Sequence, residues 1–357
     1  MKEIQSDTHP VRESEQLDWH RLEEYLRPRL YEIFGSEFQP NSRLTVEQFG
    51  GGHSNLTYLL RFGDRELVLR RPPFGKLPPK AHDMAREFRI LQMLNPVFPL
   101  APRVFHLCED VDIIGSTFYL MERRRGVVVQ NSEPPEISGS PEMRKKISGS
   151  LVDTLADLHL VDAEKSGLLS LGKPEGFVER QVRGWTERWR LSQTDELPTM
   201  NELAGWLKSN LPPEPERYSF LHGDFKLDNA MLDPDDLGKI NAVLDWEMSA
   251  PGHPLIDLGI LLGYWVYAGQ RSKTLRFTTM MDKEGWFERD QIIERYQSQT
   301  NFNLDDLRYF EVFAVFKNAV VAQQIFYRFK SGQTDDPRFA NFDAAVIELS
   351  RLAANLI

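Results

Sequence analysis

The residues best suited to chemistry lie in the segment 222–229 (HGDFKLDN) and, farther along the chain, at Asp245. Asp224 carries a carboxylate that can accept a proton from a hydroxyl group. Lys226 can neutralise the charge of a phosphoryl group in transfer. Asn229 and Asp245 offer the hard oxygen ligands that suit Mg²⁺. The types of these residues and their order along the chain indicate phosphoryl transfer.

A β-hairpin must bring Asp245 back to the segment 222–229. Residues 230–232 and 240–244 are apolar, and they flank the sequence DPDDLG at 233–238. Two short apolar runs around such a turn are typical of an antiparallel hairpin. We therefore expect Asp245, at the far end of the hairpin, to lie beside the loop that carries Asp224 and Asn229.

The order of base, cation, metal ligand, hairpin and second metal ligand resembles the protein-kinase loop H-R-D-L-x-x-x-N followed by D-F-G. Gly223 replaces the Arg, and Asp-Trp-Glu at 245–247 replaces Asp-Phe-Gly. On these residues the chain resembles the aminoglycoside phosphotransferase and choline kinase superfamily, over about residues 20–355. Within it, the chain is similar to bacterial phosphotransferases related to the kinase-like domain of acyl-CoA dehydrogenase fusion proteins. The motifs behind this narrower likeness are LRRPP at 69–73, LADLH at 155–159, DLG at 257–259 with Tyr264-Trp265, and Phe316-Lys317.

The resemblance implies an α+β, protein-kinase-like bilobal fold, in which a small antiparallel sheet with one helix precedes a larger, mainly α-helical lobe. Alternating apolar residues from Leu44 to about residue 122 predict the strands, and helical spacing dominates farther along. The expected parts are a frayed N-terminus, a nucleotide-binding lobe, a hinge and a helical lobe, at 1–18, 19–122, 123–130 and 131–357. The last part would contain the catalytic loop 222–229 and the metal-binding segment 245–247.

A glycine-rich segment joins two of the predicted strands and is the candidate phosphate cradle. Gly51 and Gly52 are followed by Ser54 and Asn55. Glycines let the backbone approach phosphate oxygens closely, and backbone N–H groups there can bind them. The alternative is an ordinary flexible turn, since the segment lacks the G-x-G-x-x-G pattern of protein kinases.

The resemblance also assigns an ion pair that orients the nucleotide phosphates. In kinases a Lys on the third strand pairs with a Glu of the following helix. Arg70 ends the corresponding strand here, and Glu87 lies on the same face of the predicted helix 83–94 as Met84 and Leu91. Arg can hold a carboxylate and a phosphate and stays charged. The alternatives are a surface pair without a role, or Arg71 in place of Arg70.

Further roles follow from the resemblance. Adenine would be recognised by backbone groups near Glu122 and Arg124, where the two lobes join. Asp257 would support the backbone of the catalytic loop from a buried helix, and His222 would hold the geometry of that loop. Glu247 is open between a second Mg²⁺ and a local structural contact.

Composition limits the classes of protein. The net charge of −10 argues against a protein that coats nucleic acid, because binding to a phosphate backbone needs a basic surface. Cys108 is the single cysteine, which excludes an intrachain disulfide. The apolar run 259–269 is too short to span a bilayer, which takes about 20 residues. We expect a cytoplasmic protein without a membrane partner, and the oligomeric state stays open.

The function expected from the sequence is an ATP- and Mg²⁺-dependent phosphotransferase that acts on a hydroxyl of a small molecule. The acceptor stays open among aminoglycosides, choline-like alcohols and hydroxyacyl compounds, with the narrower likeness favouring the last. One alternative is a nucleotide-binding pseudokinase that serves as a sensor or scaffold. Another is a metal-dependent hydrolase that uses His222, Asp224 and Asp245, although the eight His residues show no paired spacing.

Overall fold

A computed structural model describes residues 7–39, 41–50, 55–75, 82–130, 132–271 and 281–357. The chain divides into two compact units, Met1–Arg125 and Gly126–Ile357, which we call unit 1 and unit 2. The boundary falls inside the segment 123–130, where the sequence predicts a hinge.

Unit 1 is built on one antiparallel sheet. Its strand order is β1-β2-β3-β4-β6-β5. The strands are β1 (Thr8–His9), β2 (Leu44–Phe49), β3 (Leu56–Phe62), β4 (Arg65–Arg71), β5 (Val104–Cys108) and β6 (Phe118–Glu122). In β4, Leu67 and Leu69 belong to the hydrophobic core on one face of the sheet. Because side chains alternate along a strand, Arg70 projects from the other face.

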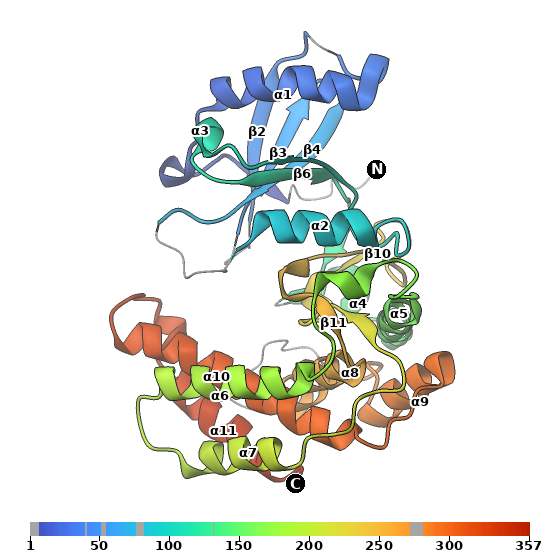
Figure 1. The fold of residues 1–357 in the computed structure, drawn as a ribbon, viewed down its shortest axis with the longest axis vertical. Helices are drawn as coiled ribbons and strands as arrows, with labels where there is room; N and C mark the ends of the chain where they lie inside the picture. Colours follow the sequence, from blue (N-terminus) through green and yellow to red (C-terminus); the bar gives the residue numbers. More distant parts are fainter. Residues whose placement is uncertain (1–6, 40, 51–54, 76–81, 131, 272–280) are drawn as a thin grey trace. The chain divides into compact units, whose positions relative to one another are not determined.

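The core of unit 1 forms where helix α1 (Trp19–Phe34) packs on the sheet (Figure 1). Leu22, Leu26 and Leu30 recur at helical spacing and are fully buried. Burying each such side chain contributes roughly 1.5–3 kcal/mol. The helix begins where the Asp18 side chain accepts a hydrogen bond from the backbone N–H of Arg21.

Residues 7–18 differ from the frayed end that the sequence predicts. β1 pairs with the end of β2, and the backbone N–H of Arg12 donates to the Gln48 side chain at 3.1 Å. Val11 and Leu17 pack against the hydrophobic core. The polar composition of this segment hides these contacts, because only two of its side chains carry the apolar packing. Residues 1–6 lie outside the described residues.

Helix α2 (Met84–Leu94) follows β4 in the chain and contacts β5 and β6. The Asp83 side chain accepts from the backbone N–H of Arg86 and so begins the helix. Glu87 is buried on the face that also buries Ile90 and Leu91. A four-residue helix, α3 (Val111–Ile114), lies between β5 and β6 in the chain.

Unit 2 contains two small sheets. The first has the strand order β10-β9-β7, and the second pairs β8 with β11. The strands are β7 (Val127–Val128), β8 (Ser219–Leu221), β9 (Ala230–Leu232), β10 (Ile240–Val243) and β11 (Ala250–Gly252). β9 and β10 are antiparallel, so they form the hairpin that the sequence predicts before Asp245.

Helices make up most of unit 2. They are α4 (Pro135–Ser138), α5 (Pro141–Leu160), α6 (Phe177–Ser192), α7 (Pro198–Ser209), α8 (Leu255–Leu262), α9 (Arg289–Thr300), α10 (Leu307–Lys330) and α11 (Phe342–Ala354). A π-helical turn, Gly263–Arg271, continues from α8. Helix α5 begins at Pro141, shortly after α4 ends. It begins there because Ser140 caps α5 and proline suits the first helical turn.

Helix α10 is the central helix of unit 2. It lies among the other helices of unit 2 (Figure 1) and contacts α6, α7, α8 and α11. It is buried almost all round from Leu307 to Val320. Lys317 and Glu311 are buried on this helix among aromatic residues. A buried charge is costly unless it is paired, so both side chains need partners.

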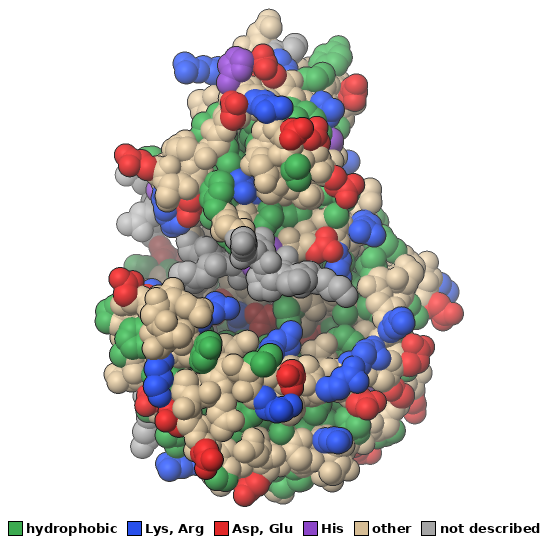
Figure 2. All heavy atoms as spheres, turned by 60° about the vertical axis from the view of Figure 1, so that its left-hand side comes forward, with side chains coloured by type: hydrophobic (Ala, Val, Ile, Leu, Met, Phe, Trp, Pro, Cys, Tyr) green, Lys and Arg blue, Asp and Glu red, His purple; other side chains and the backbone are tan. Residues whose placement is uncertain are grey.

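The surface carries both signs of charge. On the face drawn in Figure 2, Lys and Arg side chains are interspersed with Asp and Glu side chains. Over the described ranges, no helix combines the length and the apolar character that a bilayer span requires.

Candidate active site

The backbone of the catalytic loop is held by a buried carboxylate. Asp257, in the first turn of α8, accepts hydrogen bonds from the backbone N–H groups of His222 (2.6 Å) and Gly223 (2.8 Å). His159 of α5 lies 3.3 Å from the same carboxylate. Burial raises the pKa of Asp257, but the hydrogen bond and charge of His159, with the backbone donor, outweigh burial and lower it. Asp257 therefore stays ionised and fixes where the loop begins.

His222 and Gly223 shape the loop. The Nε2–H of His222 donates to the Leu244 carbonyl at 2.9 Å, and Nδ1 accepts from the backbone N–H of Asp224 at 3.2 Å. Both ring nitrogens are thus occupied, which leaves His222 no free base. Gly223 adopts φ +83°, and a Cβ there would lie 2.5 Å from the Met248 carbonyl oxygen. The glycine is required at this position, where the kinase motif has Arg.

The carboxylate of Asp224 contacts four side chains. Lys226 Nζ lies 2.6 Å from Oδ2, and Asn229 Nδ2 lies 3.4 Å from the same oxygen. Lys317 Nζ and the Tyr264 hydroxyl each lie 3.2 Å from Oδ1. These partners come from the loop itself, from the π-helical turn after α8 and from α10. The arrangement places two ammonium groups and one ionised carboxylate together.

The electrostatics of this cluster favour the charged forms. Burial raises the pKa of Asp224, but the positive charges of Lys317 and Lys226 outweigh burial and hold it well below its usual range. Burial opposes the charge of Lys226, yet Tyr264 and Asp224 raise its pKa. Burial raises the pKa of Asp228 to about 6, against the charge of Lys226. At neutral pH the cluster therefore contains an ionised Asp224 beside a protonated Lys226, with Lys317 in contact with the other carboxylate oxygen.

Asn229 and Asp245, the predicted metal ligands, are neighbours across the start of the hairpin. The backbone N–H of Leu244 donates to the Asn229 carbonyl at 2.8 Å, so the next residue, Asp245, comes beside Asn229. The Asn229 Nδ2 also donates to the Asp224 carbonyl at 2.9 Å, so its amide oxygen is the atom that can face a cation. Asp245 adopts φ +68°, which is uncommon outside glycine and marks a constrained position.

These two residues fit a hard divalent cation. Mg²⁺ binds through one or two protein oxygens and completes its shell with phosphate oxygens and water. Throughout the described part of the chain, no three or more His, Cys, Asp and Glu side chains gather as a metal site. A transition-metal hydrolase needs such a set. The structure therefore lends no support to the hydrolase alternative.

In unit 1 the structure pairs Arg70 with Glu87. Arg70 Nε lies 3.2 Å from Oε2 of Glu87, and both side chains are largely buried. Arg71 lies on the opposite side of the strand, where Nη1 donates to the Ile114 carbonyl at 3.2 Å. Burial lowers the pKa of Arg71. Arg70 is thus the arginine that meets the helix glutamate.

The other predicted nucleotide contacts are described only in part. Gly51, Gly52 and Ser54 lie outside the described residues. Asn55 is buried, and its Oδ1 lies 2.9 Å from Nδ1 of His82.

The side chains of Glu122 and Arg124, near the end of unit 1, bind each other. Arg124 Nε lies 2.7 Å from Oε1 of Glu122, and the same oxygen accepts from the backbone N–H of Arg103 at 2.7 Å. Arg124 Nη2 also donates to the Pro99 carbonyl at 2.7 Å. Recognition of adenine by backbone groups near these two residues stays a prediction.

Sequence reasoning assigned no role to three residues of the site. Lys317, Tyr264 and His159 appear in the sequence only as markers of the family resemblance. A charged residue at position 317, inside a long apolar helical pattern, was the available signal, because a buried lysine needs a partner.

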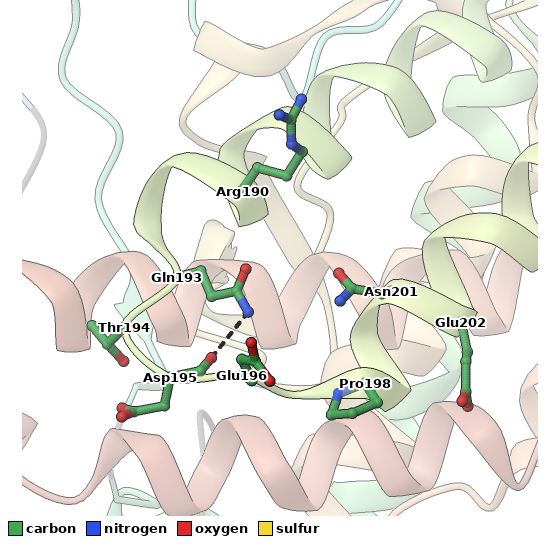
Figure 3. A pocket seen from close by; sticks show the side chains of 8 residues that line it. All are labelled: Arg190, Gln193, Thr194, Asp195, Glu196, Pro198, Asn201 and Glu202. Atoms are coloured by element: carbon green, nitrogen blue, oxygen red, sulfur yellow. Dashed lines mark hydrogen bonds between the residues drawn. The ribbon is translucent and has the colours of Figure 1, made fainter.

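One open pocket, of about 710 Å³, lies away from this cluster, between α6 and α7 (Figure 3). Its lining is polar and includes Arg190, Asp195, Glu196 and Glu202. In this lining the Gln193 side-chain amide donates a 3.0 Å hydrogen bond to the Asp195 carbonyl (Figure 3). No residue predicted for the active site lines it.

Curated proteins similar to this chain are acyl-CoA dehydrogenase family members. The chain is 35% identical to acyl-CoA dehydrogenase family member 11 of Rattus norvegicus over 333 residues, which cover 92% of this chain and 42% of that protein. It is 33% identical to family member 10 of Mus musculus, covering 92% of this chain and 30% of that protein. The chain therefore spans less than half the length of these curated relatives.

Solved structures share the fold. One of them, from Ralstonia eutropha, is described as a putative aminoglycoside phosphotransferase. It is 28% identical to this chain, with a TM-score of 0.79 over 96% of this chain and 98% of that one. Choline kinase from Cryptosporidium parvum is 13% identical, with a TM-score of 0.64 over 95% of this chain and 96% of that one, which shows the fold alone. The expected kinase-like bilobal α+β fold is thus confirmed.

A family model matches most of the chain. The model described as the phosphotransferase enzyme family matches residues 45–287, which include Arg70, Glu87, the catalytic loop and Asp245. The resemblance stated from the sequence is confirmed by this match and by the relatives above. The chain belongs to the phosphotransferase enzyme family.

Proposed function

We propose that this protein is an ATP- and Mg²⁺-dependent phosphotransferase that moves the γ-phosphoryl group to a hydroxyl group of a small molecule. The observation that carries the proposal is the ionised Asp224 between Lys226 and Lys317, in the same loop as Asn229 and next to the hairpin that ends at Asp245. A carboxylate, cations and hard oxygen ligands are the groups that phosphoryl transfer uses.

The bond changes are simple. The acceptor oxygen forms a bond to the γ-phosphorus, and the bond from that phosphorus to the β–γ bridging oxygen breaks, so that ADP leaves. The hydroxyl proton passes to the Asp224 carboxylate and then to solvent. A weak base such as Asp224 suffices, because the loose transition state depends on positioning more than on strong basicity.

Lys226 and the oxygen ligands handle negative charge. The Lys226 ammonium lies at the open edge of the cluster, with 21% of its side chain exposed, and can neutralise the phosphoryl group in transfer. Asn229 and Asp245 would hold Mg²⁺, which when bound neutralises charge on the phosphate oxygens. Their carboxylate and amide oxygens suit this ion.

Arg70, held by Glu87, would contact the ATP phosphates. Its guanidinium stays charged and can bind a phosphate oxygen while it keeps the carboxylate. Nucleotide use is in keeping with the fold, since two structures of similar fold are described as GDP complexes of aminoglycoside phosphotransferases.

For the acceptor we propose a hydroxyacyl compound, such as a hydroxy acid or a hydroxyacyl-CoA. The support is that the relatives at 32–35% identity are acyl-CoA dehydrogenase family members, of which this chain matches one part. Aminoglycosides and choline-like alcohols are the competing acceptors, since structures of similar fold carry those names.

The decisive experiment measures ADP formation from Mg-ATP in the presence of hydroxyacyl-CoAs, free hydroxy acids, choline-like alcohols and aminoglycosides. We expect acceptor-dependent turnover with a hydroxyacyl compound, and a loss of about 10³-fold in Asp245→Ala with the fold retained. Asp235→Ala, an exposed carboxylate in the hairpin turn, is the matched control. Near-normal turnover in Asp245→Ala would refute the mechanism.

The pseudokinase alternative has a different signature. It predicts nucleotide binding without phosphate transfer to any acceptor in the panel. The ionised Asp224 and its neighbouring cations form a complete polar set, which favours the active enzyme over this alternative.

A further inference from the structure

The two oxygens of the Asp224 carboxylate have different kinds of partners. Oδ2 is contacted by Lys226 and Asn229, which belong to the same loop. Oδ1 is contacted by Lys317 and Tyr264, which come from α10 and from the π-helical turn after α8. One oxygen is therefore held by the loop and the other by the helical body of unit 2.

Lys317 is a buried cation with few alternatives. Only 4% of its side chain is exposed, against 21% for Lys226. Its Nζ lies 3.0 Å from the Gly223 carbonyl oxygen and 3.2 Å from Oδ1 of Asp224. The Trp185 ring lies 5.6 Å from the same nitrogen. A buried ammonium is costly without partners. The contacts with these two oxygens therefore fix the position of the Lys317 ammonium and, in turn, the positions of both oxygens.

Tyr264 contributes a second fixed contact. Its hydroxyl lies 3.2 Å from Oδ1, and its ring lies under Lys226 with Nζ 4.6 Å from the ring centre. The π-helical turn that carries it is a rare element, found frequently at functional sites. Two donors on Oδ1 fix the plane of the carboxylate, so Oδ2 is the oxygen that can exchange a partner for an acceptor hydroxyl.

We infer that Lys317, assisted by Tyr264, is a positioning residue that holds Oδ1 of Asp224 so that Oδ2 faces the acceptor hydroxyl. This inference rests on the proposed function, because it concerns the same carboxylate. Lys226, at the exposed edge, yields its place on Oδ2 when the acceptor binds. Lys317 keeps its contacts with Oδ1 and the Gly223 carbonyl throughout the reaction.

The test uses the full chain, Mg-ATP and the panel acceptor with the highest wild-type turnover. We expect Lys317→Met to lower kcat by about 100-fold, since a misplaced catalytic group costs about this much. The KM for ATP should change by less than about threefold, because Lys317 contacts Asp224 and the Gly223 carbonyl and none of the residues proposed to hold Mg-ATP. Lys317→Arg keeps a cation, so its kcat should be about tenfold higher than that of Lys317→Met. Tyr264→Phe, which keeps the ring, should lower kcat by about tenfold.

A double-mutant cycle separates positioning from a structural role. In an Asp224→Asn background, Lys317→Met should cost less than about threefold, because the carboxylate on which it acts is gone. Lys330→Met, at the exposed end of the same helix, is the control and should keep wild-type kcat.

Each outcome decides something. If the wild type turns over an acceptor and Lys317→Met keeps near-normal kcat, the inference fails while the proposed function stands. An undiminished effect of Lys317→Met in the Asp224→Asn background also overturns it, since Lys317 would then act without Asp224. The inference is also overturned if Lys317→Met lowers the melting temperature together with kcat while Tyr264→Phe keeps its kcat. In that case Lys317 would have a structural role only. If the wild type turns over no acceptor, the proposed function fails first, and this inference with it.

Discussion

Two carboxylates of unit 2, Asp257 and Asp224, are both held in the ionised form, but by different kinds of groups. Asp257 lies beneath the loop and accepts from two backbone N–H groups, with His159 as its third partner. Asp224 lies in the loop itself and is contacted by side chains, two of them lysines. In both, burial raises the pKa and the partners reverse that shift.

The difference separates structure from chemistry. Backbone donors cannot move without unfolding the loop, so Asp257 is suited to fixing a shape. Side-chain donors can rotate and be exchanged for a substrate, so Asp224 is suited to contacting one. Removing Asp257 should therefore appear mainly in stability, and removing Asp224 mainly in turnover.

The largest effect is expected for Asp224→Asn. This change keeps the shape and the hydrogen bonds to Asn229 but removes the charge, so acceptor-dependent turnover should fall by about 10³-fold or more. ADP formation with the active acceptor measures it, and thermal melting checks the fold. Turnover within tenfold of the wild type would mean that this carboxylate is not the one that contacts the acceptor.

Asp257→Ala should mainly destabilise the protein. It leaves two buried backbone N–H groups and His159 without their acceptor, which costs about 3–5 kcal/mol. Urea denaturation followed by circular dichroism measures the free energy of unfolding, with the exposed Glu202→Ala of α7 as the control. A cost below about 1 kcal/mol would contradict the distinction between the two carboxylates.

A buried histidine near the start of α8 should make stability depend on pH. Burial, with the nearby charge of His159, lowers the pKa of His253 from its ordinary 6.5 to about 4. Its Nδ1 accepts from the backbone N–H of Leu255 at 3.2 Å, which requires a neutral ring. Between these pH values the unfolded chain binds the proton and the folded chain does not. Stability should therefore fall as pH decreases from about 6.5 to about 4, by up to roughly 3 kcal/mol.

The variant His253→Gln isolates this contribution. Glutamine can still accept from the Leu255 N–H but does not titrate, so its free energy of unfolding should depend less steeply on pH across that window. Urea denaturation of both proteins at several pH values gives the two slopes. Identical slopes would show that His253 does not titrate as its burial suggests.

The smallest effect is expected in unit 1, where a single guanidinium holds a carboxylate. Arg70→Met should weaken binding of Mg-ATP by about tenfold, because one charged hydrogen bond to phosphate is lost. Arg70→Lys should lose less. Nucleotide titration measures the effect, and Arg61→Met, which breaks ion pairs on β3, is the control. Equal affinities in Arg70→Met and Arg61→Met would remove Arg70 from the nucleotide contacts.

Much of the fold was predictable because its signals are local. The spacing of Leu22, Leu26 and Leu30 is typical of a helix, and two apolar runs around a turn are typical of the hairpin. The segment 7–18 was not, since its order depends on a few contacts with β2 and with the core that its polar composition does not reveal.

The residues of the candidate site also divide into those that the sequence could indicate and those that it could not. Asp224, Asn229 and Asp245 could be selected from their types and spacing, and the structure places the first two in contact and the third next to Leu244, which bonds to Asn229. Lys317 and Tyr264 could not, because they lie 93 and 40 residues from Asp224 in the chain. No local pattern links residues at such separations.

The order of residues in 222–229 and the hairpin behind it determined, without any coordinates, which chemical groups this loop carries. Helical spacing farther along the chain also predicted a mainly helical lobe, to which α10 belongs. Only the tertiary structure decided which loop Lys317 of α10 contacts and which oxygen of Asp224 it holds. The reason is that periodicity specifies which face of a helix is buried, whereas the partner of a buried charge depends on how helices distant in sequence pack around it.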